Sequence, residues 1–211
     1  MLEPQIRGAI PEGEPKVADR RGVDLTPLDP RRDARRLQAY CWADQPARLA
    51  RLRAALAIAA DHPAPVDQGD AAAWLAAQLR DPVPGRLTVV FHTVAAQYFP
   101  PEARAACSDS LLRAGAAAGP DAPLAHLAME ADGGDGAGLT LTLWDGARRD
   151  WDLGRADFHG RWIDWSPQPR APGGLPMPPA ASQPAATRKG CRWSLRSMSW
   201  AAACSPVRPA P

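Results

Sequence analysis

Three polar residues of this chain each follow a short apolar run, at a point where a strand is expected to end. Asp24 closes the run GVD, Asp70 follows VDQG, and His92 closes LTVVFH. In an open parallel sheet, ligands bind outside the carboxyl ends of the strands. An acid there commonly accepts hydrogen bonds from the ribose of a nucleotide cofactor, and an imidazole can act as a general base. We therefore take Asp24 and Asp70 as candidate cofactor-binding residues and His92 as the candidate catalytic residue.

Each candidate also has a purely structural interpretation. Asp24 is well placed for an Asx turn, and Asp70 for the N-cap of a following helix. His92 can instead be buried, with its ring donating a hydrogen bond to a loop carbonyl. Two further polar groups, Gln97 and Tyr98, follow within one or two turns and could complete a polar pocket. These alternatives stay open at the level of sequence.

Other site chemistries have less support. His159, in the segment DFHGRWIDW, could close over a ligand, although a turn between two edge segments explains it equally well. The four histidines never occur at metal-ligand spacing, so no metal is expected. The sequence contains neither a Gly-x-Ser-x-Gly elbow nor a GxxxxGK[ST] phosphate loop, so a serine or cysteine nucleophile has no support.

The candidates depend on an alternation of strands and helices for their positions. Strands are expected in 16–25, from Val66, in RLTVVF and in PLAHLAME, with Ala-rich helical segments between them. RLTVVF is apolar without alternation, which is typical of a parallel strand covered on both faces. This order predicts a mostly parallel α/β sheet with right-handed crossovers.

The pattern then changes. LTLTLW alternates strictly, Asp145-Gly146 is a hairpin turn signal, and RRDWDL fits the returning strand. RWIDW adds an edge strand or a packing segment. We therefore expect the sheet to finish with an antiparallel hairpin.

Composition divides the chain into three parts. Residues 1–15 are expected to be a disordered N-terminal segment, and 16–166 an α/β domain. From 167 to 211 there are ten prolines, six basic residues and no acid, which predicts a disordered tail. The tail can be a basic recognition arm, a tail without purpose, or GC-rich DNA translated out of frame.

Charge and cysteine usage bound the class of protein. Residues 1–166 hold 19 basic and 23 acidic residues, a net charge of −4, which gives no reason to expect nucleic acid or an anionic membrane as partner. The four cysteines form no CxxC pair and are expected to be reduced. No signal-peptide core and no apolar run of membrane-spanning length occurs. These features predict a cytoplasmic protein.

The segments RRGVDLTPLDP, DARRLQAYCWADQPARLARLRAAL, QGDAAAWL, VVFHTVAAQYFPPEAR and ADFHGRW together resemble the bacterial domain-of-unknown-function family 2332 over about residues 10–166. The family's usual Asp-Leu-Asn-Pro stands here as Asp-Leu-Thr-Pro from Asp24. The family has no established activity to carry over.

The strand order of that family looks like that of class I S-adenosylmethionine-dependent methyltransferases. The resemblance implies an incomplete Rossmann-like sheet, with Asp24 at the cofactor ribose, Asp70 at the adenine edge and His92 at the acceptor. Family members carry upstream a first strand and a glycine turn that this chain lacks. We therefore expect a truncated or frameshifted member that is weakly stable and inactive as it stands, because neighbouring strand edges would be exposed.

Three functional hypotheses follow. The first is a fragment of a methyltransferase-like domain, with S-adenosylmethionine as the cofactor of intact relatives. The second is a nucleotide- or metabolite-binding module without catalysis, and the third is a remnant without a ligand. Methyl transfer from a sulfonium requires little beyond positioning and in-line approach, so the sequence separates the first two poorly.

Overall fold

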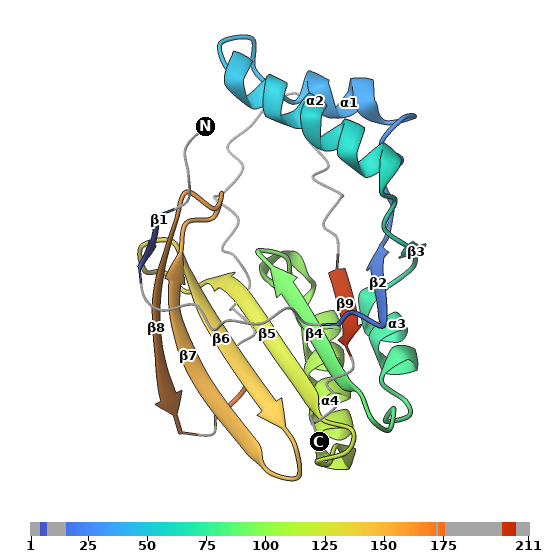
Figure 1. Cartoon of the computed structure of the whole chain (residues 1–211), viewed down its shortest axis with the longest axis vertical. Helices are drawn as coiled ribbons and strands as arrows, with labels where there is room; N and C mark the ends of the chain where they lie inside the picture. Colours follow the sequence, from blue (N-terminus) through green and yellow to red (C-terminus); the bar gives the residue numbers. More distant parts are fainter. Residues whose placement is uncertain (1–4, 8–15, 172, 176–199, 206–211) are drawn as a thin grey trace.

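A computed structural model describes residues 5–7, 16–171, 173–175 and 200–205 of this chain. The described residues form one nine-stranded sheet with four α-helices and one short 3-10 helix (Figure 1). The strands are β1 (Gln5–Arg7), β2 (Asp19–Asp24), β3 (Val66–Gln68), β4 (Leu87–Thr93), β5 (Leu124–Ala131), β6 (Ala137–Trp144), β7 (Arg148–Ala156), β8 (Trp162–Arg170) and β9 (Trp200–Ser205). The helices are α1 (Ala34–Ala39), α2 (Pro46–Asp61), α3 (Ala71–Gln78), η1 (Ala96–Tyr98) and α4 (Pro101–Ala117).

The sheet combines parallel and antiparallel pairing. Its strand order is β1-β8-β7-β6-β5-β4-β9-β2-β3. β2 pairs with β3 in parallel, and so does β4 with β5, whereas β5 to β8 form an antiparallel series. The predicted α/β class is confirmed in this mixed form.

The local expectations hold at most elements. The first helical segment consists of two helices, α1 and α2, and α2 starts at Pro46, a residue that the first helical turn tolerates. The predicted hairpin joins β6 to β7. Its turn glycine, Gly146, has a φ of 104°, a conformation that favours glycine.

The end of the chain differs from the expected boundary at residue 166. β8 continues to Arg170, and residues 200–205 form β9 between β2 and β4. β9 runs antiparallel to both neighbours. The expected exposed edges at the centre of the sheet are therefore paired, because a strand from the predicted tail fills the gap. The rest of that tail, residues 176–199 and 206–211, and most of the N-terminal segment lie outside the described residues.

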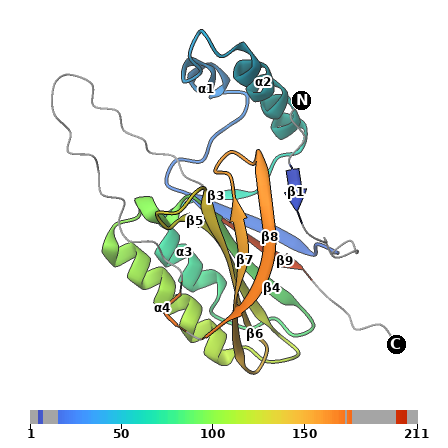
Figure 2. The same cartoon turned by 90° about the vertical axis from the view of Figure 1, so that its left-hand side faces the viewer.

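The core lies between one face of the sheet and two helices. α3 and α4 both lie on this face, which Figure 2 shows with the sheet seen near its edge. Buried residues from the helices and strands form a single cluster: Val23, Leu75, Val90, Ala95, Cys107, Leu111, Leu124 and Trp144. At Gly115, an added Cβ atom would lie 2.5 Å from the Trp144 ring, so glycine permits the close approach of α4 to β6.

Candidate functional site

Asp24 lies at the end of β2 and is mostly buried, with 7% of its surface exposed. Its Oδ1 accepts a hydrogen bond of 2.7 Å from the Thr26 backbone N–H, which is an Asx turn. Its own backbone carbonyl accepts from the N–H of Gly69, just beyond β3. Asp24 therefore fixes the turn after β2 and ties that turn to the end of β3.

Asp70 is the N-cap of α3. Its Oδ1 accepts hydrogen bonds of 3.0 Å from the backbone N–H groups of Ala72 and Ala73. Because Asp24 pairs with Gln68, two residues before Asp70, both acids come from the ends of neighbouring parallel strands. The structure thus brings the two candidate cofactor-binding residues to one edge of the sheet, and each has a local structural role there.

His92 lies elsewhere, in a buried polar cluster between β4 and β5. Its Nδ1 is 2.6 Å from Glu130 Oε1, and its Nε2 is 3.0 Å from His126 Nε2. All three residues are at least nine-tenths buried. The two rings lie 5.1 Å apart between centroids and are tilted by 32°.

The register of the sheet explains this cluster. His92 pairs with Ala128, so His126 and Glu130, two positions to either side, lie on the same face of β5. Ala128 contributes only a methyl group between them, which leaves room for the His92 ring. The geometry matches the alternative in which His92 is buried, with a carboxylate rather than a loop carbonyl as its partner.

Glu130 also holds the chain after β4. Its Oε1 accepts hydrogen bonds from the backbone N–H groups of Ala95 and Ala96, at 2.9 and 3.0 Å. Just before them, Val94 has a φ of 51°, a left-handed conformation that is strained for a β-branched residue. The carboxylate therefore occupies an anion-binding turn formed by the protein's own backbone.

The electrostatics of the cluster depend on burial and on this pairing. Burial, together with the neighbouring His92, lowers the pKa of His126 to about 3, so the ring is neutral at physiological pH. For Glu130, burial acts to raise the pKa, but the hydrogen bonds from His92, Ala95 and Ala96 outweigh it and the pKa is lowered. The cluster thus combines a carboxylate with a neutral imidazole at opposite ends of His92.

Glu130, His92 and His126 form a continuous hydrogen-bonded row of side chains. The carboxylate accepts from Nδ1–H of His92, which leaves a single proton to be shared between the two Nε2 atoms. Two buried atoms at its ends, Glu130 Oε2 and His126 Nδ1, have no hydrogen-bond partner within the described part of the chain. Because the His92 side chain is fully buried, this group of three side chains orders the interior and does not itself present a group to a surface ligand.

The weaker candidates do not join the hydrogen bonds of this cluster, although η1 adjoins it through Ala96. Tyr98 is half exposed on η1, and Gln97 is partly buried beside it. His159 belongs to a turn organised by Asp157, which accepts from the backbone N–H groups of His159 and Arg161. The Arg161 guanidinium pairs with Asp157 and holds the pKa of that carboxyl well below its usual range.

Sequence reasoning missed Glu130 and His126. The available signal was their alternation in LAHLAMEA, where both residues fall on the face that should be covered by a helix. A buried strand face that carries a histidine and a glutamate requires polar partners for both.

Two absences are observed among the described residues. No group of three histidine, cysteine or carboxylate side chains there could hold a metal ion. None of the helices in the described ranges is long and apolar enough to span a bilayer.

The sheet and its helices define a mixed α/β protein with acids at the carboxyl ends of β2 and β3 and a separate buried carboxylate–histidine cluster between β4 and β5. Its sequence matches the model of a family of uncharacterized proteins conserved in bacteria (DUF2332) over residues 1–165, and the chain belongs to that family. Searches of curated proteins and of solved structures gave no match.

Proposed function

We propose that this chain is a Rossmann-like, methyltransferase-like domain that binds a nucleotide or a related metabolite without catalysing methyl transfer. The observation that carries the proposal is the pair Asp24 and Asp70 at the carboxyl ends of adjacent parallel strands. These strands lie beside the point where the strand order reverses direction. From the strands β2 and β4, which flank β9, β3 lies on one side and β5 on the other. Ligands of open α/β sheets bind at such a point.

The chemistry of the edge suits the hydroxyl and amino groups of a nucleoside. Carboxylates accept hydrogen bonds from both, and a hydrogen bond to a charged group contributes about 1.5–3 kcal/mol. The N-terminus of α3 also lies at this edge, with Asp70 already capping it. A neutral sugar or base therefore suits the edge better than an additional anion.

S-adenosylmethionine fits the described residues only in part. The resemblance assigns Asp24 to the ribose and Asp70 to the adenine, and the position of both acids at the ends of β2 and β3 supports this assignment. The central position, where the resemblance implies a parallel strand followed by a glycine turn, is filled by the antiparallel strand β9. Because the described ranges provide no glycine turn after a parallel strand at that position, we favour binding without methyl transfer.

Isothermal titration calorimetry with adenosine and with S-adenosylhomocysteine tests the proposal on the full chain. Asp24→Asn keeps an acceptor for the Thr26 N–H but removes the charge. We expect at least one of these ligands to bind and the dissociation constant to rise about tenfold or more in this variant. Asp19→Asn is the matched control, since Asp19 is an exposed acid at the start of the same strand.

The result that would overturn the proposal is equally plain. If neither ligand binds to the wild-type chain, or if Asp24→Asn and Asp19→Asn bind with wild-type affinity, the acids do not form a nucleoside site. Thermal unfolding of each variant checks that the turn after β2 is intact.

A further inference from the structure

The second face of the sheet carries an apolar surface. By the register of β4 to β7, this surface is formed by alternate residues of four neighbouring strands: Val89, Phe91, Leu127, Met129, Leu139, Leu141, Leu143 and Trp151. We call it the open face. Leu127 is 36% exposed, and the other seven side chains are partly exposed.

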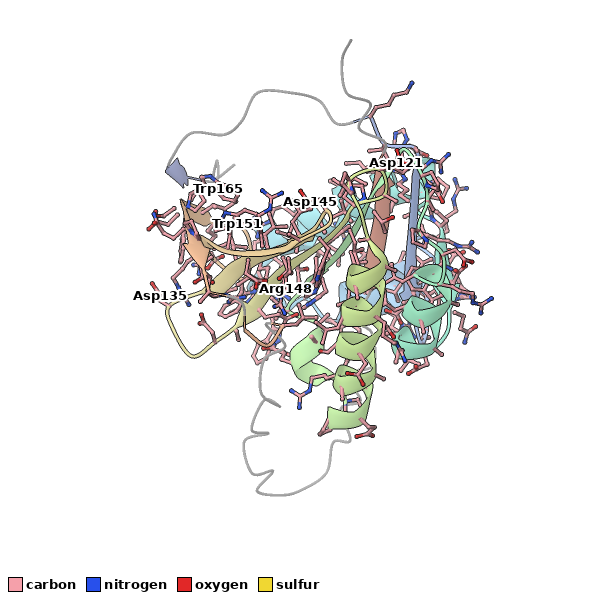
Figure 3. All side chains as sticks on the ribbon, turned by 90° about the horizontal axis from the view of Figure 1, so that it is seen from below. Asp121, Asp135, Asp145, Arg148, Trp151 and Trp165 are labelled. Carbon is pink, nitrogen blue, oxygen red and sulfur yellow. The ribbon has the colours of Figure 1, made fainter. Side chains whose placement is uncertain are left out.

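No described helix covers the open face. Figure 2 shows α3 and α4 together on the opposite side of the sheet. In Figure 3, Trp151 and Trp165 lie on the side of the sheet away from α4, whereas Arg148 lies on the α4 side. A contiguous apolar surface of this kind marks an interaction site.

Crossover handedness indicates which element belongs on the open face. The connections from β3 to β4 and from β4 to β5 run in one direction across the sheet, and their helices α3 and α4 share a face. The connection from β2 to β3 runs in the opposite direction, so a right-handed crossover places its helices on the other face. Those helices are α1 and α2, residues 34–61.

Yet the α1–α2 hairpin does not pack on the sheet of its own chain. It extends beyond the sheet at the top of Figure 1, and neither helix contains a buried residue. In α2, the leucines at 49, 52 and 56 are partly covered, while a stripe of small and apolar residues is exposed beside Arg51 and Asp61: Ala47, Ala50, Ala54, Ala57 and Ile58. These exposed apolar residues of α2 are available to pack against another surface.

We propose that two copies of this chain exchange their α1–α2 hairpins, so that the exposed stripe of α2 packs on the open face of the partner copy. The α1–α2 hairpin leaves the sheet of its own chain uncovered and exposes its own apolar side. Both features fit such an exchange, which gives a symmetric dimer. The small alanines of the stripe permit close packing on the leucines of the face.

The size of the contact is sufficient for a dimer. A 16-residue helix is about 24 Å long and about 10 Å wide, which gives a footprint of roughly 240 Å². Each of the two contacts buries this area on the hairpin and again on the partner's open face. Together they remove about 1,000 Å² from water, without any contribution from α1. That value reaches the lower bound of specific interfaces.

Sedimentation equilibrium of the full-length chain tests this inference with three single variants. Leu127→Arg places a charge on the open face, and Ile58→Asp places one on the exposed stripe of α2. We expect the wild type to be a dimer and each variant to raise the dimer dissociation constant at least tenfold. Leu112→Arg is the matched control, because Leu112 is 39% exposed on α4, away from both surfaces, and is expected to leave the dimer intact.

A mixture of the two interface variants distinguishes exchange from other contacts. The Leu127→Arg variant keeps an unaltered hairpin, and the Ile58→Asp variant keeps an unaltered open face. In the heterodimer these two surfaces meet, so one of the two contacts is restored. We expect the equimolar mixture to dimerise more strongly than either variant alone. A monomeric wild type, an effect of Leu127→Arg without one of Ile58→Asp, or no recovery in the mixture would overturn the proposal.

Discussion

The buried ring of His126 makes the stability of this chain depend on protonation. His126 is neutral in the folded protein because its pKa is lowered to about 3, whereas the ring of an unfolded chain titrates near its ordinary value of 6.5. The unfolded state therefore binds a proton at a pH where the folded state does not. Above pH 6.5 both states are neutral, and the folded state has its full stability with respect to this group.

Acidification from pH 6.5 towards pH 4 is expected to destabilise the protein. The loss approaches about 1.4 kcal/mol for each pH unit in which only the unfolded state is protonated at this site. Urea unfolding at intervals between pH 7 and pH 4 measures it. His126→Gln removes this part of the slope, while His159→Gln, at an exposed turn, leaves it unchanged. Equal slopes in the wild type and His126→Gln would contradict the neutral, buried state of the ring.

At the scale of elements, α4 and β6 approach each other closely because Gly115 faces Trp144. A methyl group there would lie 2.5 Å from the indole ring. The cluster that surrounds this contact includes Leu111 and Leu124, so the ring has little freedom to move. Glycine lowers the intrinsic helix propensity of α4 but allows the packing that covers the core.

Gly115→Ala is expected to destabilise the fold by about 1–3 kcal/mol, since overpacking outweighs the gain of roughly 1 kcal/mol in helix propensity. Chemical denaturation followed by tryptophan fluorescence measures the change in stability. Gly119→Ala is the control, because an added Cβ atom meets nothing within 4 Å there. A variant at position 115 that is more stable than the wild type would show that the helix can shift at no cost.

The elements were predictable to the extent that their signals are local. RLTVVF indicated β4, and Asp145-Gly146 indicated the turn between β6 and β7, because strand propensity and turn chemistry act within a few residues. Asp70 was recognised as a helix cap for the same reason. The partnership of His92 with Glu130 was not predictable, since it depends on the register between two strands separated by a helix.

β9 shows, at the scale of the whole molecule, that local sequence signals do not predict every strand. Its residues, Trp200–Ser205, follow a Pro-rich stretch and contain three alanines, which are poor strand formers. Pairing on both sides forms the strand nonetheless, because β2 and β4 leave a gap of one strand between them. Tertiary context of this kind overrides local propensity.

The two halves of the sheet are joined through β9. In the described residues, β2 and β3 reach the remaining strands by backbone pairing only through it. Ala202→Pro removes an N–H group from this central strand, so we expect a loss of about 3 kcal/mol or more and weaker protection of β2 amides in hydrogen exchange. Ala202→Ser keeps the N–H group and is the control. Wild-type protection of β2 in Ala202→Pro would show that β9 does not connect the halves.

The position of β9 also determines the order in which parts of the sheet can fold. A ribosome releases β2 and β4 long before residues 200–205, yet these two strands flank the place that only the late segment fills. During synthesis the nascent chain therefore holds two partial sheets with unpaired edges, which is the kind of species that chaperones bind. Pairing between Arg21 and Ala202 joins residues that are far apart in the sequence, so closure of the sheet is a slow, late step of folding.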